Sequence, residues 1–90
     1  MIAEQEFTIS NKLGLHARPA ALFVKISNGF DSEIWVEKDD EEVNGKSIMG
    51  LMMLAAGHGS RIKVRAEGDD AEAAIAGLGE LIMSQFSEES

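Results

Sequence analysis

A histidine followed closely by an arginine and a proline gives this chain its clearest candidate for phosphate chemistry. His16 lies two residues before Arg18 and three before Pro19, and an apolar run starts at Ala20. Because proline is tolerated in the first turn of a helix, a helix is predicted to begin directly after His16. The unpaired amides and the positive dipole end of that helix favour an anion such as phosphate beside the imidazole.

This placement predicts that His16 carries a phosphoryl group on a ring nitrogen while Arg18 binds the phosphate oxygens. A neutral imidazole is a good nucleophile near neutral pH, and the helix dipole disfavours its protonated form. The guanidinium of Arg18 is always charged, and its forked donors match an oxyanion. On spacing alone, a polar surface histidine and a surface arginine that balances local acids remain the alternative.

A second segment, from Asn44 to Met52, combines a serine with a very apolar stretch. Ser47 is predicted to cap a short helix over Ile48 to Ala55. That helix is apolar nearly all round, and one small core cannot bury every side of it. The excess predicts a surface patch for protein partners, to which flexible methionines adapt well. Ser47 is also a candidate for phosphorylation, because a phosphoserine suits a helix start yet repels negatively charged partners.

Length, composition and charge exclude several classes of protein. The 90 residues suffice for one small domain, assigned to residues 1–90. With no cysteine and two histidines, neither a disulfide framework nor a metal site is predicted. A net charge of −8 argues against nucleic acid and against an anionic membrane surface. No apolar run approaches the ~20 residues of a membrane span, and no signal peptide is visible, so a cytoplasmic protein is expected.

The basic residues are not spread evenly along this acidic chain. Lys12, Arg18, Lys25 and Lys46 lie in or near the two segments that carry the candidate chemistry. If the fold brings these segments together, a locally positive patch is expected beside His16, which suits the handling of phosphate.

Hydrophobic periodicity predicts seven elements in the order β-α-β-β-α-β-α. The predicted strands are Glu4–Ser10, Ser32–Lys38, Glu41–Asn44 and Arg61–Glu67, and the first two helices are Ala17–Asn28 and Ile48–Ala55. Gly29 is predicted to end the first helix as a left-handed residue. Asp69, with Glu72, is predicted to cap a third helix whose apolar face runs from Ala71 to Phe86. This order favours an α+β fold in which helices cover one face of a four-stranded antiparallel sheet.

Two motifs resemble one known family over nearly the whole chain. The stretch Gly14-Leu15-His16-Ala17-Arg18-Pro19-Ala20 resembles the active-site signature of the histidine-containing phosphocarrier family of the bacterial phosphotransferase system, known as HPr. Asn44 to Met52 is similar to that family's regulatory serine segment and follows about thirty residues downstream, as in the family. The resemblance implies an HPr-like open-faced β-sandwich.

The same resemblance implies a phosphocarrier rather than a turnover enzyme. Enzyme I, charged by phosphoenolpyruvate, is expected to phosphorylate a ring nitrogen of His16, which is Nδ1 in the family, and His16 then passes the group to an EIIA-type protein. No metal or organic cofactor is implied, and a monomer is expected. In the family, partners dock on the positions that match Ala17, Arg18, Ala21, Ile48, Met49 and Met52.

The branch of the family stays open. The opening Asn-Lys-Leu-Gly-Leu-His, residues 11–16, is similar to carriers of the nitrogen-regulatory branch. The Ser47 segment is instead similar to carriers regulated by a serine kinase and phosphorylase, although many members carry this serine without such a kinase. The alternative function is therefore a regulatory binding protein that acts through partner contacts and Ser47 phosphorylation.

Overall fold

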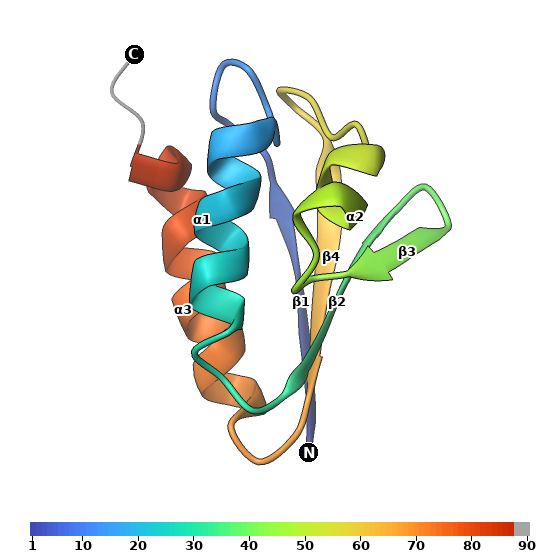
Figure 1. Ribbon diagram of the computed structural model, residues 1–90. Coiled ribbons are helices and arrows are strands. Elements are labelled where there is room, and N and C mark those ends of the chain that lie inside the picture. Colours follow the sequence, from blue (N-terminus) through green and yellow to red (C-terminus); the bar gives the residue numbers. More distant parts are fainter. Residues whose placement is uncertain (88–90) are drawn as a thin grey trace.

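Four strands and three helices alternate along residues 1–87, the part of the chain that the computed structural model describes (Figure 1). The elements are β1 (Ile2–Thr8), α1 (Ala17–Ser27), β2 (Glu33–Lys38), β3 (Glu41–Asn44), α2 (Ile48–Met53), β4 (Arg61–Glu67) and α3 (Ala71–Met83), followed by a 3₁₀ turn at Gln85–Ser87. The strand order is β1-β4-β2-β3, and every neighbouring pair is antiparallel. The predicted α+β fold is confirmed.

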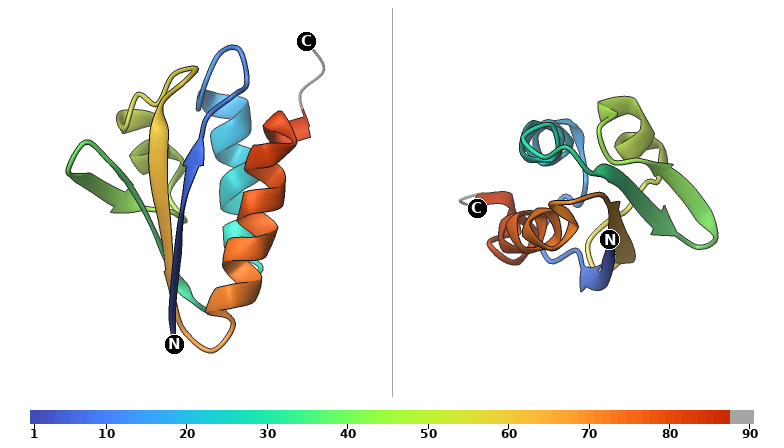
Figure 2. Two further views of the ribbon diagram at one scale, coloured as in Figure 1. Left: turned by 180° about the vertical axis from the view of Figure 1, so that it is seen from behind. Right: turned by 90° about the horizontal axis from the view of Figure 1, so that it is seen from below.

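The helices form a second layer on one face of the sheet. α1 and α3 lie side by side, and α2 packs beside α1 near β3 (Figures 1 and 2). Alternation along β4 buries Ile62, Val64 and Ala66 against this layer. From the helices, Phe23, Leu51 and Leu78 are fully buried in the same core. This two-layer arrangement fixes the directions of α1 and α2, which carry the two motifs.

Among the described residues, no helix covers the opposite face of the sheet (Figure 2), and charged side chains lie on it. Lys63 lies between Glu6 of β1 and Glu37 of β2 in the strand register, and its Nζ is 3.8 Å from the Glu37 carboxylate. Arg65 is 3.3 Å from the Glu42 carboxylate. Cross-strand ion pairs of this kind stabilise the sheet modestly and offset part of the net negative charge of the chain.

Several boundaries differ from prediction because tertiary contacts set them. β1 begins at Ile2 rather than Glu4 and ends at Thr8, because its residues pair with the whole length of β4. α2 ends at Met53, and Ala55 has a left-handed φ of 52°. α3 ends at Met83, although Phe86 in the following turn is still buried.

The predicted left-handed cap at Gly29 is wrong. α1 ends at Ser27, and the residues with positive φ do not include Gly29. The amide of Gly29 donates to the Ile26 carbonyl at 3.0 Å, and that of Phe30 donates to the Ser27 carbonyl at 3.1 Å. These bonds, each to the third residue back, satisfy the last carbonyls, so the helix ends without a left-handed residue.

The predicted cap of the third helix is also wrong, because Asp70 rather than Asp69 precedes α3. The Asp70 side chain makes no capping bond to its own helix. Its carboxylate accepts hydrogen bonds from the amides of Asp31 at 2.8 Å and Ser32 at 3.0 Å, and from the Ser32 hydroxyl. Asp70 therefore ties the α1–β2 loop to the β4–α3 loop.

This tie predicts an acid-sensitive contribution to stability. Hydrogen bonds from the Ser32 hydroxyl and the Asp31 amide hold the pKa of the Asp70 carboxyl below its ordinary value of 3.8. A group with a lowered pKa stabilises the fold above its ordinary pKa, and that contribution is lost as the pH falls through the lowered value. Urea unfolding of wild type and Asp70→Asn over a pH series will show the variant less stable at neutral pH, with a gap that closes in acid. A gap that is constant down to strongly acidic pH contradicts this role.

Candidate functional site

Two loops meet at one end of the molecule and build the surroundings of His16. The acceptor loop, residues 9–16, connects β1 to α1, and the facing loop, residues 54–60, connects α2 to β4 (Figure 1). The amide of Leu15 donates to the Ala56 carbonyl at 2.8 Å. Ile9 exchanges backbone hydrogen bonds with the facing loop, donating to Ser60 at 2.8 Å and accepting from Gly59 at 2.7 Å. The position of His16 thus depends on both loops.

His16 is the residue directly before α1, its N-cap, as the motif predicts. It has an extended backbone, with φ −85° and ψ −169°, and its carbonyl accepts the helix hydrogen bond of Ala20 at 2.9 Å. The amides of Ala17 and Arg18 precede that first bond and have no intrahelical acceptor, while Pro19 carries no N–H. The half-buried imidazole therefore lies at the amide-rich, positive end of an 11-residue helix.

Gly14 bends the acceptor loop toward the facing loop. Its φ is +71°, in the region that favours glycine, and a Cβ there would lie 2.5 Å from the Ala56 oxygen and 2.6 Å from the Gly57 Cα. Position 14 therefore requires glycine for two reasons, the left-handed backbone and the lack of space for a Cβ.

A shallow hollow of about 270 Å³ opens beside the imidazole. It is lined by His16 together with Leu13, Leu15, Met52 and the facing loop from Ala55 to Gly57. Leu13 is 71% exposed, an unusual state for a large apolar side chain. Leu13 is not among the site residues that the sequence predicts. Its position as an apolar residue between Lys12 and Gly14, in a predicted loop, is the signal that identifies it.

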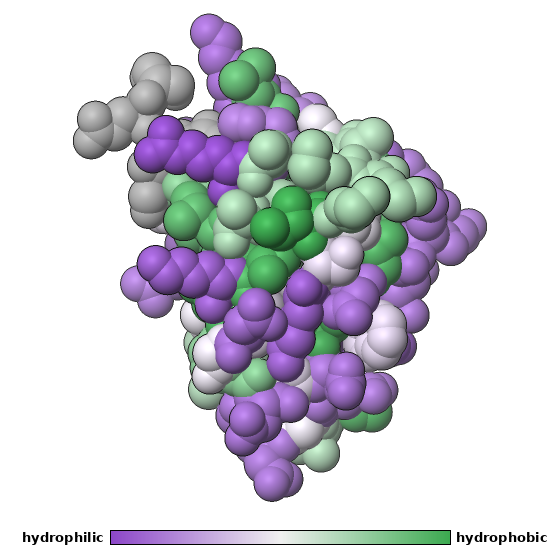
Figure 3. All heavy atoms as spheres, viewed as in Figure 1, coloured by the Kyte–Doolittle hydropathy of each residue, from purple (hydrophilic) through white to green (hydrophobic). Residues whose placement is uncertain are grey.

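Exposed apolar side chains of α2 form a patch next to this hollow. Ile48, Met49, Met52 and Met53, here called the methionine patch, are exposed, whereas Leu51 and Leu54 are buried. The prediction that one core cannot bury every side of this helix is confirmed. Figure 3 shows a continuous apolar surface over α2 and the adjacent start of α1.

The other predicted docking residues lie on α1 and share this accessibility. Ala17, Arg18 and Ala21 are exposed, and α1 packs directly beside α2. Arg18 stands in the first helical turn, two residues after His16. The structure therefore brings the two motifs onto adjacent helices.

Ser47 caps α2 as predicted. Its side-chain oxygen accepts a hydrogen bond from the Gly50 amide at 3.0 Å, and its backbone is extended, with φ −119° and ψ 116°. The hydroxyl is half-buried at the edge of the methionine patch. Ser47 thus directly precedes the exposed residues Ile48 and Met49.

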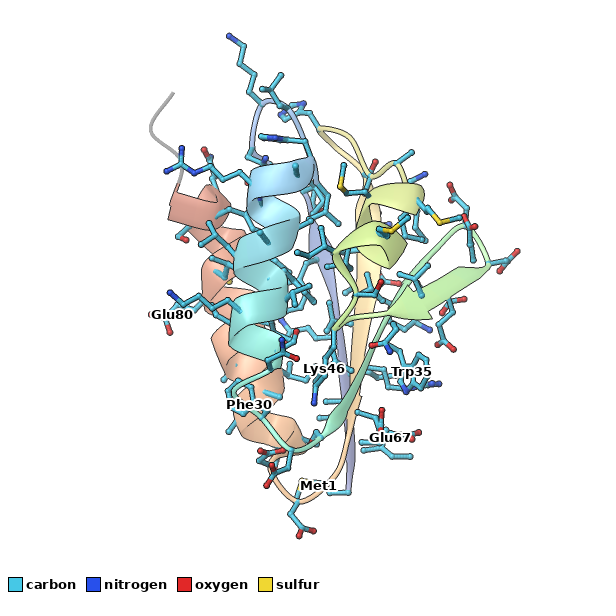
Figure 4. All side chains as sticks on the ribbon, viewed as in Figure 1. Met1, Phe30, Trp35, Lys46, Glu67 and Glu80 are labelled. Carbon is cyan, nitrogen blue, oxygen red and sulfur yellow. The ribbon has the colours of Figure 1, made fainter. Side chains whose placement is uncertain are left out.

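The expected cluster of basic residues forms only in part. Lys12 and Arg18 belong to the His16 end of α1. Lys46 lies at the other end, where its Nζ donates to the Phe30 carbonyl at 2.9 Å, just beyond the last turn of α1 (Figure 4). A lysine at the negative end of a helix dipole is electrostatically favourable, which explains this placement.

Within residues 1–87, no group of three or more His, Cys, Asp or Glu side chains has the arrangement of a metal site. Within the same residues, no helix has the length and apolar character required to cross a bilayer.

Comparisons with known proteins agree with this geometry. A family model described as the PTS HPr component phosphorylation site matches residues 3–84. Phosphocarrier protein HPr of Neisseria meningitidis is 49% identical over 85 residues, covering 94% of this chain and 96% of that protein. The HPr-like protein Crh of Halalkalibacterium halodurans is 52% identical over 77 residues, covering 86% and 92%.

The fold of this chain is also similar to that of a solved HPr structure. HPr of Thermoanaerobacter tengcongensis superposes with a TM-score of 0.94 at 56% identity, over 98% of this chain and 99% of that one. Because the family model spans most of the chain and its relatives are about half identical to it, this chain belongs to the HPr family, the phosphocarrier proteins of the phosphotransferase system.

Proposed function

We propose that this protein accepts a phosphoryl group on His16 from phosphoenolpyruvate-charged enzyme I and passes it to an EIIA-type protein. The observation that carries the proposal is the imidazole at the start of α1, beside an open hollow and an exposed apolar patch. A buried histidine could not meet a protein donor, and an isolated surface histidine would lack the helix amides. His16 combines access with an anion-stabilising position.

The transfer needs one nucleophilic nitrogen and a cradle for the phosphate oxygens. A ring nitrogen of His16 attacks phosphorus, so that a P–N bond forms as the bond between phosphorus and the donor breaks. The first amides of α1 and the Arg18 guanidinium stabilise the oxygens through charge-assisted hydrogen bonds. Transfer onward is the reverse exchange: an acceptor nucleophile attacks phosphorus, and the imidazole nitrogen leaves with its electron pair. The chain carries the group without catalysing turnover alone.

The methionine patch, with Ala17, Arg18 and Ala21, is proposed to receive donor and acceptor in turn. One surface must then bind at least two different proteins, and methionine side chains adapt to different shapes at low cost. The apolar hollow beside His16 continues this surface up to the reacting nitrogen. Docking there excludes water from the phosphoryl group during transfer.

The test is phosphorylation of the purified chain. Incubation with enzyme I and phosphoenolpyruvate should add one phosphoryl group, seen by intact mass, only when both are present. The added group should be lost in mild acid, because a phosphohistidine P–N bond is acid-labile whereas a phosphoserine ester is not. Subsequent addition of an EIIA-type protein should return the chain to its original mass. An acid-stable adduct, or none, overturns the proposal.

Regulation through Ser47 by a serine kinase belongs to the same proposal, and the cap geometry makes it testable. Ser47→Ala removes the bond to the Gly50 amide and should cost about 1 kcal/mol of unfolding free energy. Aspartate caps about as well as serine, so Ser47→Asp should stay nearly as stable. Its charge lies beside Ile48 and Met49, however, and should repel a phosphorylated donor.

The expected pattern is therefore a destabilised but transfer-competent alanine variant and a stable but slow aspartate variant. Denaturant unfolding and rates of transfer from enzyme I, measured on both, separate the two roles. If the aspartate variant transfers at the wild-type rate, the genuine phosphoserine form decides, and a phosphoserine form that transfers equally fast eliminates regulation at this site. Cytoplasmic location and a monomeric state stay predictions.

A further inference from the structure

Asn11 stands out in the acceptor loop as a polar side chain that is almost fully buried. It is 1% exposed, and its Nδ2 donates to the Gly14 carbonyl at 2.6 Å. The backbone closes the same turn, since the Gly14 amide donates to the Asn11 carbonyl at 3.2 Å. Because the Gly14 carbonyl can only accept, the nitrogen of the Asn11 amide must be the group that faces it.

The Gly14 carbonyl links Asn11 directly to the candidate acceptor. It accepts a second hydrogen bond, from the amide of His16 at 3.0 Å. On its other side, the loop is held by the bond from Leu15 to Ala56. The orientation of the Gly14–Leu15 peptide, and with it the direction in which His16 leaves the loop, is therefore fixed by the Asn11 side chain and the facing loop together.

Stability alone does not account for an asparagine at this position. The Asn11 Oδ1 is buried and has no hydrogen-bond partner within the described chain. A buried acceptor without a donor costs free energy, and an apolar side chain of similar volume would avoid that cost. Such a replacement would not orphan the Gly14 carbonyl either, because the His16 amide still donates to it. What asparagine supplies, and an apolar side chain cannot, is the second donor to the Gly14 carbonyl.

We propose that Asn11 is a positioning residue for phosphoryl transfer: its side-chain amide holds the Gly14 carbonyl so that His16 faces the incoming phosphoryl group. This inference rests on the proposed function of His16. Displacements of about an ångström at a reacting group lower rates by up to about a hundredfold, so a loosened loop is expected to slow the chemical step rather than docking. The bond from Asn11 to Gly14 lies in the acceptor loop, whereas the proposed docking residues lie on α1 and α2.

The decisive variant is Asn11→Leu. It removes both the donor to Gly14 and the unpartnered oxygen, so its stability should stay close to wild type. Transfer from enzyme I should nevertheless show a maximal rate lowered roughly tenfold or more at an unchanged KM. In NMR spectra, the amides from Gly14 to Arg18 and the His16 ring should shift and broaden, while the α3 amides stay in place. A merely structural asparagine predicts the opposite, a transfer rate that stays at the wild-type value in a folded variant.

A second variant gives a pH signature. In Asn11→Asp, the ionised carboxylate can only accept and repels the Gly14 carbonyl, whereas the protonated acid can donate to it again. The ratio of variant to wild-type transfer rates should therefore rise as the pH is lowered. Ile75→Val in α3 is the control for lost stability. It removes one buried methyl group at a position far from the loop in sequence, so the variant should be less stable but transfer phosphate at the wild-type rate.

The outcomes separate this inference from the proposed function. If wild type is phosphorylated on His16 and Asn11→Leu transfers equally fast, the positioning role is overturned while the proposed function stands. If wild type itself takes no phosphoryl group, both are overturned. A slow Asn11→Leu variant with a raised KM and an unchanged maximal rate also contradicts positioning, because it assigns the defect to docking.

Discussion

His16→Ala is expected to abolish the acid-labile phosphoryl group completely. No other side chain of this loop offers a nitrogen nucleophile at a helix start, so no partial activity should remain. The fold should tolerate the change, because His16 is only half-buried and alanine is compatible with its extended backbone. Intact mass after incubation with enzyme I and phosphoenolpyruvate measures the loss, and denaturant unfolding confirms that the variant is folded.

The chain offers a matched control in its second histidine. His58 lies exposed in the facing loop, flanked by Gly57 and Gly59, and does not line the hollow beside His16. His58→Ala should therefore keep the full phosphoryl gain and the wild-type transfer rate. A phosphoryl group that survives in His16→Ala but disappears in His58→Ala would assign phosphorylation to His58 in the facing loop. That result would refute His16 as the acceptor.

Features set by short-range chemistry are the ones that the sequence predicts well. Pro19 places the start of α1 within one residue, because its missing amide restricts it to the first turn. Ser47 likewise identifies its own helix start, and its side-chain bond to Gly50 is the one expected. The family motifs then add roles that spacing alone leaves open, above all the choice between a phosphoryl acceptor and an ordinary surface histidine.

Features that depend on contacts between residues distant in sequence cannot be predicted from local sequence patterns. Asp70 rather than Asp69 is placed at the start of α3, and its carboxylate binds a loop 38 residues away in sequence. Lys46 binds the Phe30 carbonyl just beyond the end of α1 instead of lying beside His16. Two glycines inside α3 have no local rationale, yet Gly77 lies against the ring of Phe30 and Gly79 against the ring of Phe7. Pairing partners of this kind are visible only once the chain is folded.

Gly14→Ala is expected to disrupt both the fold and the transfer. A left-handed backbone costs a non-glycine residue about 1–2 kcal/mol, and the new Cβ adds a clash with backbone atoms of Ala56 and Gly57. Because that clash is with backbone rather than with a flexible side chain, it is relieved only if the two loops move apart. The total loss of unfolding free energy should reach about 2–4 kcal/mol, a large share of the stability of a small domain.

The same separation of the loops should also slow phosphoryl transfer beyond what the unfolded fraction explains. The bond from Leu15 to the Ala56 carbonyl must lengthen or break, and His16 moves with it. Gly57→Ala is the matched stability control, because a Cβ at Gly57 meets no atom within 4 Å and its φ is not left-handed, so its unfolding free energy should stay near wild type. Urea unfolding of both variants, with transfer rates of Gly14→Ala measured where it is fully folded, tests the argument. If Gly14→Ala is as stable as Gly57→Ala, the close approach of the two loops does not determine the geometry of the acceptor site.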